Sequence, residues 1–505
     1  MLTEGRPAVR LAKALPPLPR ADAYDKIVTR FAPNPDFVLH LGSVRAIILS
    51  HDYARMYHGS FIVRFEDTDP RLKRSVLEYY DLIREDLSWL ECSADAEFIQ
   101  SDRLQIYYDH VLNLLALGAV YVCTCEQDSF KLRVDAGQAC PCRGKSPEQN
   151  SGEWEKMLSG DFGEGQAVVR VKTDLTHPNP AVREWPALRV INPQLHPHPR
   201  VGSKYWVWPL YNFSAAIDDH VMGITHIIRG KEHQTNELRQ TYLYNAMGWK
   251  YPEAIHYGRL KTVGIKLSKS LMVKEVEEGL VDGYSDPRLA TLAALRRRGY
   301  VPSSLRKIVY ELGPRPVDAT LSWENINASN RKEVDSLAHR YSCVLDPLLM
   351  EVSGVELPQF EAHLPLHPSQ PSLGNRTLKV RADNGTIRVW LGGADLELLR
   401  KSKVVRLMEL FNIQVDSASQ KLVTARFHSQ DYMKAREMKS PLVQWLPQDQ
   451  HFPATVVMPD ASRANGLIEG SVLSEPVGAI IQMVRVGFGR IDSKDPSVVI
   501  YFAHK

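Results

Sequence analysis

Residues 25–70, DKIVTRFAPNPDFVLHLGSVRAIILSHDYARMYHGSFIVRFEDTDP, decide the fold of this chain. The run at 25–31 is short and rich in β-branched side chains, which is typical of a buried strand, and the turn at 32–35 follows it. From His40 the apolar residues recur with the spacing of a helix. Residues 61–65 (FIVRF) predict a second strand, so the stretch is a strand–helix–strand unit.

The same alternation continues on both sides of a long interruption. The expected elements are a helix at 75–90, a strand at 97–100, a helix through Leu117, a strand at 225–229, a helix at 236–247 and a strand at 254–257. Alternating strands and helices predict a parallel sheet with crossover helices. Ligands of such sheets bind beyond the carboxyl ends of the strands, next to helix N-termini.

Length and composition place the chain among large soluble proteins. It has 505 residues, which predicts several domains, and a net charge of +3, which neither favours nor excludes nucleic acid. No apolar run is long enough to span a membrane, and the N-terminal segment lacks a secretory signal. We therefore expect a cytoplasmic protein.

Four of the six cysteines, Cys123, Cys125, Cys140 and Cys142, lie within twenty residues. Two Cys-x-Cys pairs can bring four thiolates together as a tetrahedral zinc site, which would be structural. The spacing differs from the commoner Cys-x-x-Cys, so unrelated reduced thiols remain an alternative.

Two further segments carry groups that suit phosphate. His40, Gly42 and Ser43 begin the first helix, where free backbone N–H groups favour anions. Residues 264–270 (GIKLSKS) hold two lysines and two serines and suit a mobile loop that grips phosphate. Taken alone, the Lys/Ser segment is more often an ordinary solvated loop, and a capping histidine without a ligand explains His40 equally well.

The segments together resemble a known family. HLGS at 40–43 resembles the HIGH signature of class I aminoacyl-tRNA synthetases, and KLSKS at 266–270 resembles their KMSKS signature. The segments RFAPNP at 30–35, RFEDTD at 64–69 and IRGKEH at 228–233 look like the glutamyl branch, in its archaeal/eukaryotic type. Ser43 departs from the final His of the signature, and Asp36-Phe37 from the small residue and glycine that usually precede it.

The resemblance implies a reaction and a set of site residues. Glutamate and ATP would form glutamyl-adenylate, and tRNA(Glu) would then accept the glutamyl group; tRNA(Gln) is a second partner that the resemblance allows. Mg²⁺ would accompany the ATP. The catalytic residues implied are His40, Lys266 and Lys269; the ATP-binding residues are His40, Gly42, Ser43, Glu232, His233, Lys266, Ser268 and Lys269; the amino-acid-binding residues are Arg30, Asn34, Glu66, Tyr211 and Arg229.

Charge distinguishes glutamate from glutamine at this site. Glu66 suits the substrate ammonium, and Arg30 and Arg229 suit its two carboxylates, because guanidinium pairs with carboxylate through two hydrogen bonds. The glutaminyl enzymes are the runner-up, but a neutral amide needs no guanidinium at position 229. A catalytically inactive tRNA-binding relative and a tRNA-modifying nucleotidyltransferase of the same fold are less favoured, because the signatures are intact and a long C-terminal region is present.

The C-terminal third changes character. Short alternating runs at 377–380, 386–391, 404–407, 422–427, 480–486 and 497–502 predict an all-β region of two barrels, which could bind unpaired anticodon bases. We expect a monomer with an N-terminal arm (1–24), a Rossmann-like catalytic half (25–120), an inserted acceptor-binding subdomain (121–210), a second catalytic half (211–275), a helical connector that contacts the tRNA stem (276–340) and anticodon-binding β-barrels (341–505). Helices are expected in the connector at 286–299, 303–312 and 328–338.

Overall fold

The computed structural model describes residues 15–505, so most of the predicted N-terminal arm lies outside the described residues. The chain divides into two compact units. The first contains the residues up to Val263 together with 306–321, and the second contains 264–305 together with 322–505.

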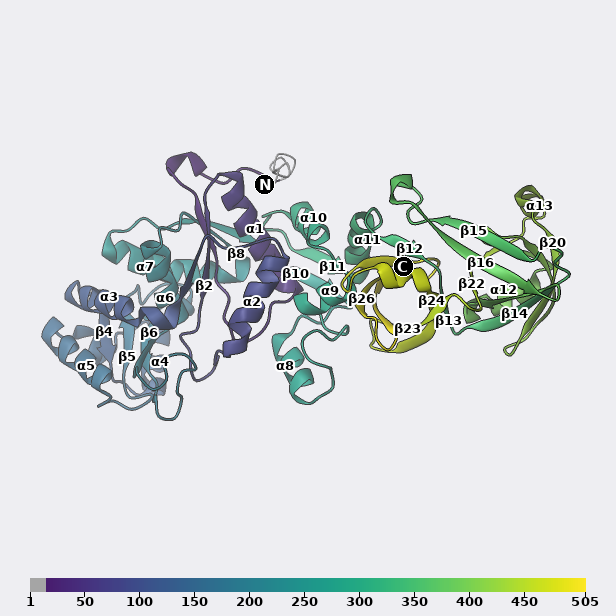
Figure 1. Ribbon diagram of the computed structural model, residues 1–505. Helices are drawn as coiled ribbons and strands as arrows, with labels where there is room; N and C mark the ends of the chain where they lie inside the picture. The colour runs from purple at the N-terminus through teal and green to yellow at the C-terminus, as the bar shows by residue number, and fades with distance from the viewer. Residues whose placement is uncertain (1–14) are drawn as a thin grey trace, which may run out of the picture. The chain divides into compact units, whose positions relative to one another are not determined.

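A five-stranded parallel sheet organises the first unit, in the order β3-β2-β1-β8-β9 (Figure 1). Its strands are β1 (Val28–Phe31), β2 (Ser60–Phe65), β3 (Ala96–Ile99), β8 (His226–Gly230) and β9 (Glu253–Tyr257), and its helices are α1 (Val44–Met56), α2 (Leu77–Trp89), α3 (Leu104–Ala116), α6 (Tyr211–Val221) and α7 (Gln234–Met247). This confirms the α/β prediction. Helix α1 begins later than expected, because residues Leu41–Ser43 form a 3-10 turn first.

The strand–helix–strand unit is tightly packed. Ile47, Ile48 and Leu49 of α1 are fully buried against the sheet. At Gly59 a Cβ atom would lie only 2.0 Å from the Ile27 carbonyl oxygen, so only glycine lets β2 start beside β1.

The insertion between the two sheet halves has its own antiparallel sheet, in the order β4-β5-β6-β7. Its elements are β4 (Val120–Cys123), α4 (Gln127–Asp135), α5 (Pro147–Ser159), β5 (Val168–Val171), β6 (Pro186–Val190) and β7 (Val207–Pro209). Helices α4 and α5 were not predicted. Helix α5 starts at a capping box between Ser146 and Gln149, a signal that is present in the sequence.

The connector is less helical than predicted. Its elements are β10 (Leu260–Val263), α8 (Lys269–Glu277), α9 (Leu292–Arg298), α10 (Pro302–Leu312), β11 (Ala319–Ser322) and α11 (Trp323–Val334). The predicted helix at 286–299 is wrong over its first half, because the Asp286 carboxylate accepts from the amides of Asp282 and Arg288 and closes a turn there. The third helix begins earlier than predicted, at the Ser322 capping box.

The remainder of the second unit is almost entirely β, as predicted. One sheet has seven strands in the order β12-β25-β26-β27-β23-β24-β13, the other runs β15-β16-β17-β14-β20-β19-β18-β21, and β22 pairs with β17. Each sheet has its own apolar core. The strands are β12 (His339–Tyr341), β13 (Cys343–Leu345), β14 (Leu348–Ser353), β15 (Gln359–Pro365), β16 (Asn375–Asp383), β17 (Thr386–Leu391), β18 (Val404–Leu407), β19 (Asn412–Ala418), β20 (Val423–Ser429), β21 (Leu442–Val443), β22 (Trp445–Pro447), β23 (His451–Val457), β24 (Arg463–Glu469), β25 (Ile480–Met483), β26 (Gly487–Ser493) and β27 (Val498–His504), with short helices α12 (Leu396–Lys401) and α13 (Tyr432–Glu437).

The predicted strand at 480–486 is wrong beyond Met483. Arg485 has a φ of 63°, which turns the chain back into β26.

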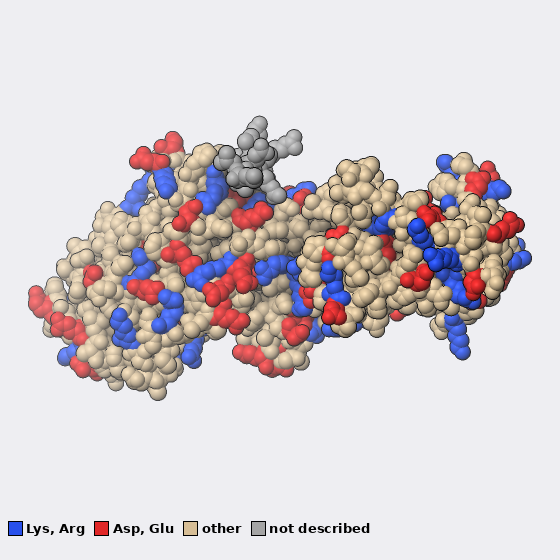
Figure 2. Space-filling model, in the orientation of Figure 1, with Lys and Arg blue, Asp and Glu red and all other residues tan. Residues whose placement is uncertain are grey.

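Charge is finely mixed on the surface. Figure 2 shows lysine and arginine side chains interspersed with acidic ones, without a large region of one sign on that face. Within residues 15–505, helices with the length and apolarity needed to cross a membrane are absent.

Candidate active site

Three neighbouring strands of the parallel sheet carry the charged residues of the candidate amino-acid site. Arg30 lies in β1, Arg229 lies in β8 and Glu66 directly follows β2. Strand β1 pairs with both β2 and β8, and parallel strands end at one edge. The predicted residues Arg30, Glu66 and Arg229 therefore converge, as their order in the sequence suggests.

A buried carboxylate that the sequence reasoning missed holds two of the guanidiniums. Asp219 in α6 accepts hydrogen bonds from Arg30 Nε at 3.0 Å and Nη2 at 3.2 Å, and from Arg64 Nη1 at 2.7 Å. Burial raises the pKa of Asp219, but Arg30 and Arg64 outweigh it, so the pKa falls to about 2. One side of the Arg30 guanidinium is thus engaged within the protein, and its Nη1 end is left for a ligand.

The adjacent Asp218 anchors the floor of the same site. It accepts from Gln100 Nε2, Arg103 Nε and Tyr107 OH at 2.9, 2.9 and 2.7 Å. Both aspartates are buried. Two consecutive acidic residues inside the largely apolar run at 213–221 could have indicated these ion pairs, because acidic residues are rarely buried unless they are paired.

Glu66 and Tyr211 lie close to these arginines, and Asn34 lies in the segment that follows β1. Glu66 accepts from Arg64 Nη2 at 2.9 Å, and burial raises its pKa. The pKa of Tyr211 is raised by burial and by the charge of Glu66, while Arg229 and Arg30 lower it, so these groups are close neighbours. The Asn34 Oδ1 atom is buried without a hydrogen-bond partner among the described residues, as expected of an atom that awaits a ligand.

Arg229 differs from Arg30 in its surroundings. Its side chain is 5% exposed, and it donates to His256, Gln240 and Tyr251. Within the described residues no carboxylate lies within ion-pair distance of it. Glu237 interacts with Arg229 electrostatically but contacts His256 instead. Among the described residues the guanidinium is therefore buried without a directly bonded carboxylate, which is costly unless a ligand supplies one.

The HLGS segment forms the helix start that the sequence predicted, with one difference. His40 Nδ1 accepts from the Gly42 amide at 3.1 Å, so this amide is engaged within the protein. For a neutral imidazole the proton then sits on Nε2. Ser43 N donates to His40 O, which closes the turn.

Glu232 and His233 lie in the 3-10 turn that follows β8. His233 Nδ1 is 3.0 Å from Asn236 Nδ2, and burial, followed by the charge of Arg229, lowers the pKa of His233. His233 is therefore neutral at physiological pH. Both residues follow the strand that carries Arg229, as predicted.

The KLSKS segment belongs to the second unit. Only part of it is a loop, because Lys269 and Ser270 form the first turn of α8. Lys266 Nζ pairs with Glu275 Oε1 at 2.9 Å, and Ser268 Oγ lies 3.1 Å from Ser270 Oγ. The side chain of Lys266 is 67% exposed, so its ammonium remains accessible to an anion.

The four clustered cysteines meet as the spacing predicted. Their sulfur atoms all lie within 4.8 Å of one another, with Cys123 Sγ 3.9 Å from Cys140 Sγ and Cys125 Sγ 3.6 Å from Cys142 Sγ. Burial raises the pKa of the Cys142 thiol, but hydrogen bonds from Thr124 outweigh burial and lower it to about 7. Zn–S bonds of about 2.3 Å in a tetrahedron place sulfur atoms about 3.8 Å apart, so the donor set fits zinc.

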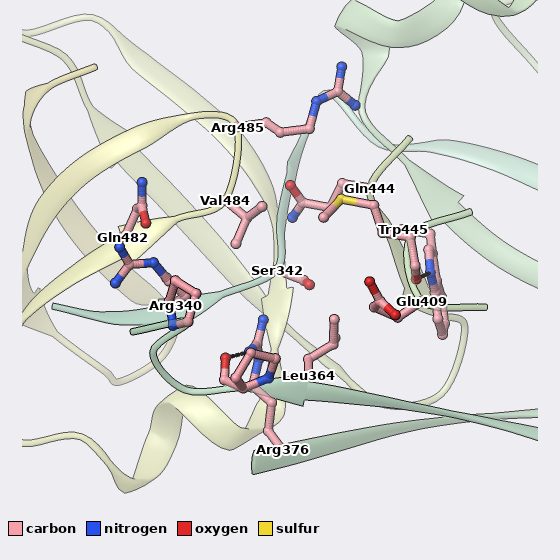
Figure 3. Close-up of a pocket in the computed structure, with 13 residues that line it drawn as sticks. Arg340, Ser342, Leu364, Arg376, Glu409, Gln444, Trp445, Gln482, Val484 and Arg485 are labelled. Carbon is pink, nitrogen blue, oxygen red and sulfur yellow. Dashed lines mark hydrogen bonds between the residues drawn. The ribbon is translucent and has the colours of Figure 1, made fainter. Parts of the chain in front are cut away.

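The second unit contains a pocket of about 270 Å³ between its two β-sheets (Figure 3). Arg340 and Gln482 stand side by side on the paired strands β12 and β25. Trp445 lies on the opposite wall and Arg376 on the floor. Trp445 is 2% exposed and its Nε1 donates to Met408 O, so it packs in the core, whereas the cationic and amide groups of Arg340 and Gln482 can hydrogen-bond to an unpaired base.

Comparisons with known proteins agree with these features. A family model described as the catalytic domain of class I tRNA synthetases (E and Q) matches residues 26–336, and the corresponding anti-codon binding domain matches residues 338–429. The chain is 48% identical over 498 residues to a glutamate–tRNA ligase of Thermococcus kodakarensis and 47% identical over 497 residues to that of Pyrococcus furiosus. Each alignment covers 98% of this chain and 85% of the relative. A crystal structure of glutamate–tRNA synthetase from Elizabethkingia anophelis is 23% identical with a TM-score of 0.45, covering 61% of this chain and 71% of that one.

Proposed function

The chain belongs to the class I tRNA synthetases for glutamate and glutamine, and we propose that it joins L-glutamate to tRNA(Glu) through glutamyl-adenylate. Its activity is the ligation of glutamate to tRNA, which relatives nearly half identical over almost the whole chain also carry in their names. The glutaminyl alternative is not favoured.

The observation that carries the choice of glutamate is the state of Arg229. A buried guanidinium without a carboxylate partner among the described residues is matched by a substrate that brings a carboxylate, and not by a neutral amide. In the proposed pose the substrate side chain meets Arg229. The ammonium group of the substrate would pair with Glu66. The Nη1 end of Arg30 and the Asn34 Oδ1 atom would make the remaining contacts.

The first step is the attack of a glutamate carboxylate oxygen on the α-phosphorus of ATP. The new P–O bond forms as the bond to the leaving pyrophosphate breaks, which yields glutamyl-adenylate and diphosphate. No covalent catalyst is needed, so the protein acts by positioning and by stabilising charge. His40 Nε2 and the ammonium groups of Lys266 and Lys269 supply that stabilisation in the proposed mechanism, and Ser268 adds a hydroxyl donor. The glycine backbone at Gly42, with Ser43, Glu232 and His233, lines the nucleotide side.

When bound with ATP, Mg²⁺ neutralises part of the phosphate charge. In the second step the ribose 2′-hydroxyl of the terminal adenosine attacks the acyl carbon, and AMP leaves. The enzyme thereby returns to its starting state.

The tRNA is proposed to contact the remaining parts of the chain. The insertion at 121–210 would take the acceptor end, and the helices of the connector would contact the stem. The pocket that contains Arg340, Trp445 and Gln482 would receive an anticodon base. The family match to an anticodon-binding domain over 338–429 includes Arg340 and supports anticodon binding by that part of the chain, while Trp445 and Gln482 lie beyond the matched range.

We propose a structural zinc ion at Cys123, Cys125, Cys140 and Cys142, supported by the sulfur separations. It would hold the end of β4 against the 3-10 turn Pro141–Gly144 and so shape the insertion. This site is structural in the proposal and takes no part in the reaction.

The decisive experiment is ATP–pyrophosphate exchange by the purified chain, with and without tRNA. We expect exchange that depends on glutamate and little exchange with glutamine. Exchange with glutamine alone would overturn the proposal. Charging of purified tRNA(Gln) in a parallel assay determines whether the enzyme accepts both tRNAs, and sedimentation tests the proposed monomer.

A further inference from the structure

Three side chains enclose the Arg229 guanidinium. Arg229 Nε donates to His256 Nε2 at 3.3 Å, Nη1 to Gln240 Oε1 at 3.4 Å and Nη2 to Tyr251 OH at 3.0 Å. The three acceptors come from β9, from α7 and from the segment between them. Tyr251 OH in turn donates to Gln240 Oε1 at 2.6 Å, so Oε1 accepts two hydrogen bonds and the amide orientation is determined by the network.

All three acceptors are neutral at physiological pH. Gln240 is an amide and is fully buried. Burial raises the pKa of Tyr251, and burial, with Arg229 and His233 nearby, lowers the pKa of His256 to about 4. Because His256 Nε2 accepts from Arg229, its proton lies on Nδ1, which is 3.4 Å from Glu237 Oε2.

The other buried arginines of the site have charged partners in the protein. Arg30 pairs with Asp219, and Arg64 pairs with Asp219, Glu66 and Asp218, so protein carboxylates already balance their charges. Gln240 stands next to Arg229 where a glutamate of nearly equal size would fit and would balance its charge too. The neutral residue at this position leaves the charge of Arg229 for a ligand.

We propose that Gln240, Tyr251 and His256 are positioning residues for substrate selection. This inference rests on the proposed function. They orient the guanidinium with neutral acceptors only, so that the substrate's side-chain carboxylate becomes its counter-ion. Selectivity for glutamate over glutamine thus depends on the absence of negative charge at these three positions as well as on Arg229.

The test adds one negative charge beside Arg229 without removing it. In Gln240→Glu, and independently in His256→Glu, the new carboxylate would pair with the Arg229 guanidinium in place of the substrate's side-chain carboxylate. We expect the KM for glutamate in the exchange assay to rise at least about tenfold, and the preference for glutamate over glutamine to fall by about 10- to 100-fold. The KM for ATP should change much less than the KM for glutamate, and least in Gln240→Glu, because His256 is the one of the two that lies near the proposed nucleotide residue His233.

Two control variants separate charge from shape. Asn245→Asp adds the same charge at an exposed position near the end of α7. It should leave the KM for glutamate and the preference for glutamate over glutamine at the wild-type level. His256→Gln keeps a neutral acceptor and should retain the preference for glutamate.

The outcomes distinguish this inference from the proposed function. If either Gln240→Glu or His256→Glu folds, as judged by circular dichroism, and keeps the wild-type KM and preference, the inference is wrong. If His256→Gln loses the preference as fully as His256→Glu, shape rather than charge is responsible and the inference is again wrong. If the wild-type chain does not activate glutamate at all, the proposed function fails first.

Discussion

Asp219 accepts two hydrogen bonds from Arg30, at 3.0 and 3.2 Å, although neither residue is near the other in the chain. The pair joins strand β1 to helix α6 beneath the amino-acid site. It also determines which end of the Arg30 guanidinium is left for a substrate.

Replacing Asp219 by Asn should impair both folding and activity. The change leaves Arg30 buried without a carboxylate partner, while Arg64 keeps Glu66 and Asp218, and breaking a buried pair in this way costs about 3–5 kcal/mol. We expect a lower midpoint of urea unfolding for the first unit, followed by its tryptophan fluorescence, and a raised KM for glutamate. Asp102→Asn, which removes an exposed carboxylate paired with Arg200, is the matched control. A wild-type midpoint for Asp219→Asn would contradict this role.

The same pair predicts the acid limit of stability. The pKa of Asp219 is lowered from 3.8 to about 2 in the folded protein, so its contribution is fully present above pH 4 and is lost as pH falls toward 2. The linkage amounts to roughly 2 kcal/mol. Urea unfolding measured in steps from pH 5 to pH 2 should show this loss in wild type and a smaller one in Asp219→Asn. Equal pH dependence in the two proteins would rule out Asp219 as its source.

Replacing Arg229 by Leu should remove selection for glutamate. Losing two charge-assisted hydrogen bonds to a carboxylate costs about 3–6 kcal/mol, or a 10²- to 10⁴-fold fall in kcat/KM for glutamate. The KM for ATP should stay near the wild-type value. Steady-state pyrophosphate exchange measures kcat/KM for glutamate and KM for ATP. An unchanged kcat/KM would show that the side-chain carboxylate of the substrate binds elsewhere.

Replacing Lys269 by Ala should slow adenylate formation without unfolding the protein. Removing one donor that stabilises developing charge typically costs about 10²- to 10³-fold in rate. Lys274→Ala on the same helix, which removes a lysine paired with Glu278, should remain at the wild-type rate. Single-turnover formation of adenylate separates the two variants, and equal rates would remove Lys269 from the mechanism.

Replacing Cys140 by Ser should release the proposed zinc ion. Three thiolates bind zinc much more weakly than four, and the insertion would lose its metal cross-link. Metal analysis should find about one zinc per wild-type chain and per Cys343→Ala chain, since Cys343 lies in the second unit. Purified wild-type protein without zinc would refute the site.

The local patterns of the sequence were sufficient for much of the fold. The strand–helix–strand unit at 25–70 and the later strand β8 follow from the apolar pattern, because each buries an apolar stripe or run. Helix α7 buries only Gln240, Leu243 and Tyr244, and no residue of β9 is fully buried, so the alternation of strands and helices indicated these two elements. Boundaries failed where polar side chains compete with the helix, as Asp286 does by closing a turn. The charged residues at strand ends identified the candidate site, since parallel strands end together.

Only the tertiary structure revealed what surrounds those residues. Arg30 and Arg229 look alike in the sequence, yet one is paired with Asp219 and the other is held by neutral side chains. The difference depends on α6, α7 and β9, which lie about 190 residues or more from Arg30 in the chain. Sequence determines which charges exist and which strand ends carry them. Long-range packing decides which of these charges are already balanced within the protein. The reason is that a buried charge pairs with a group that is close in the folded structure, and that group can be far away in the sequence.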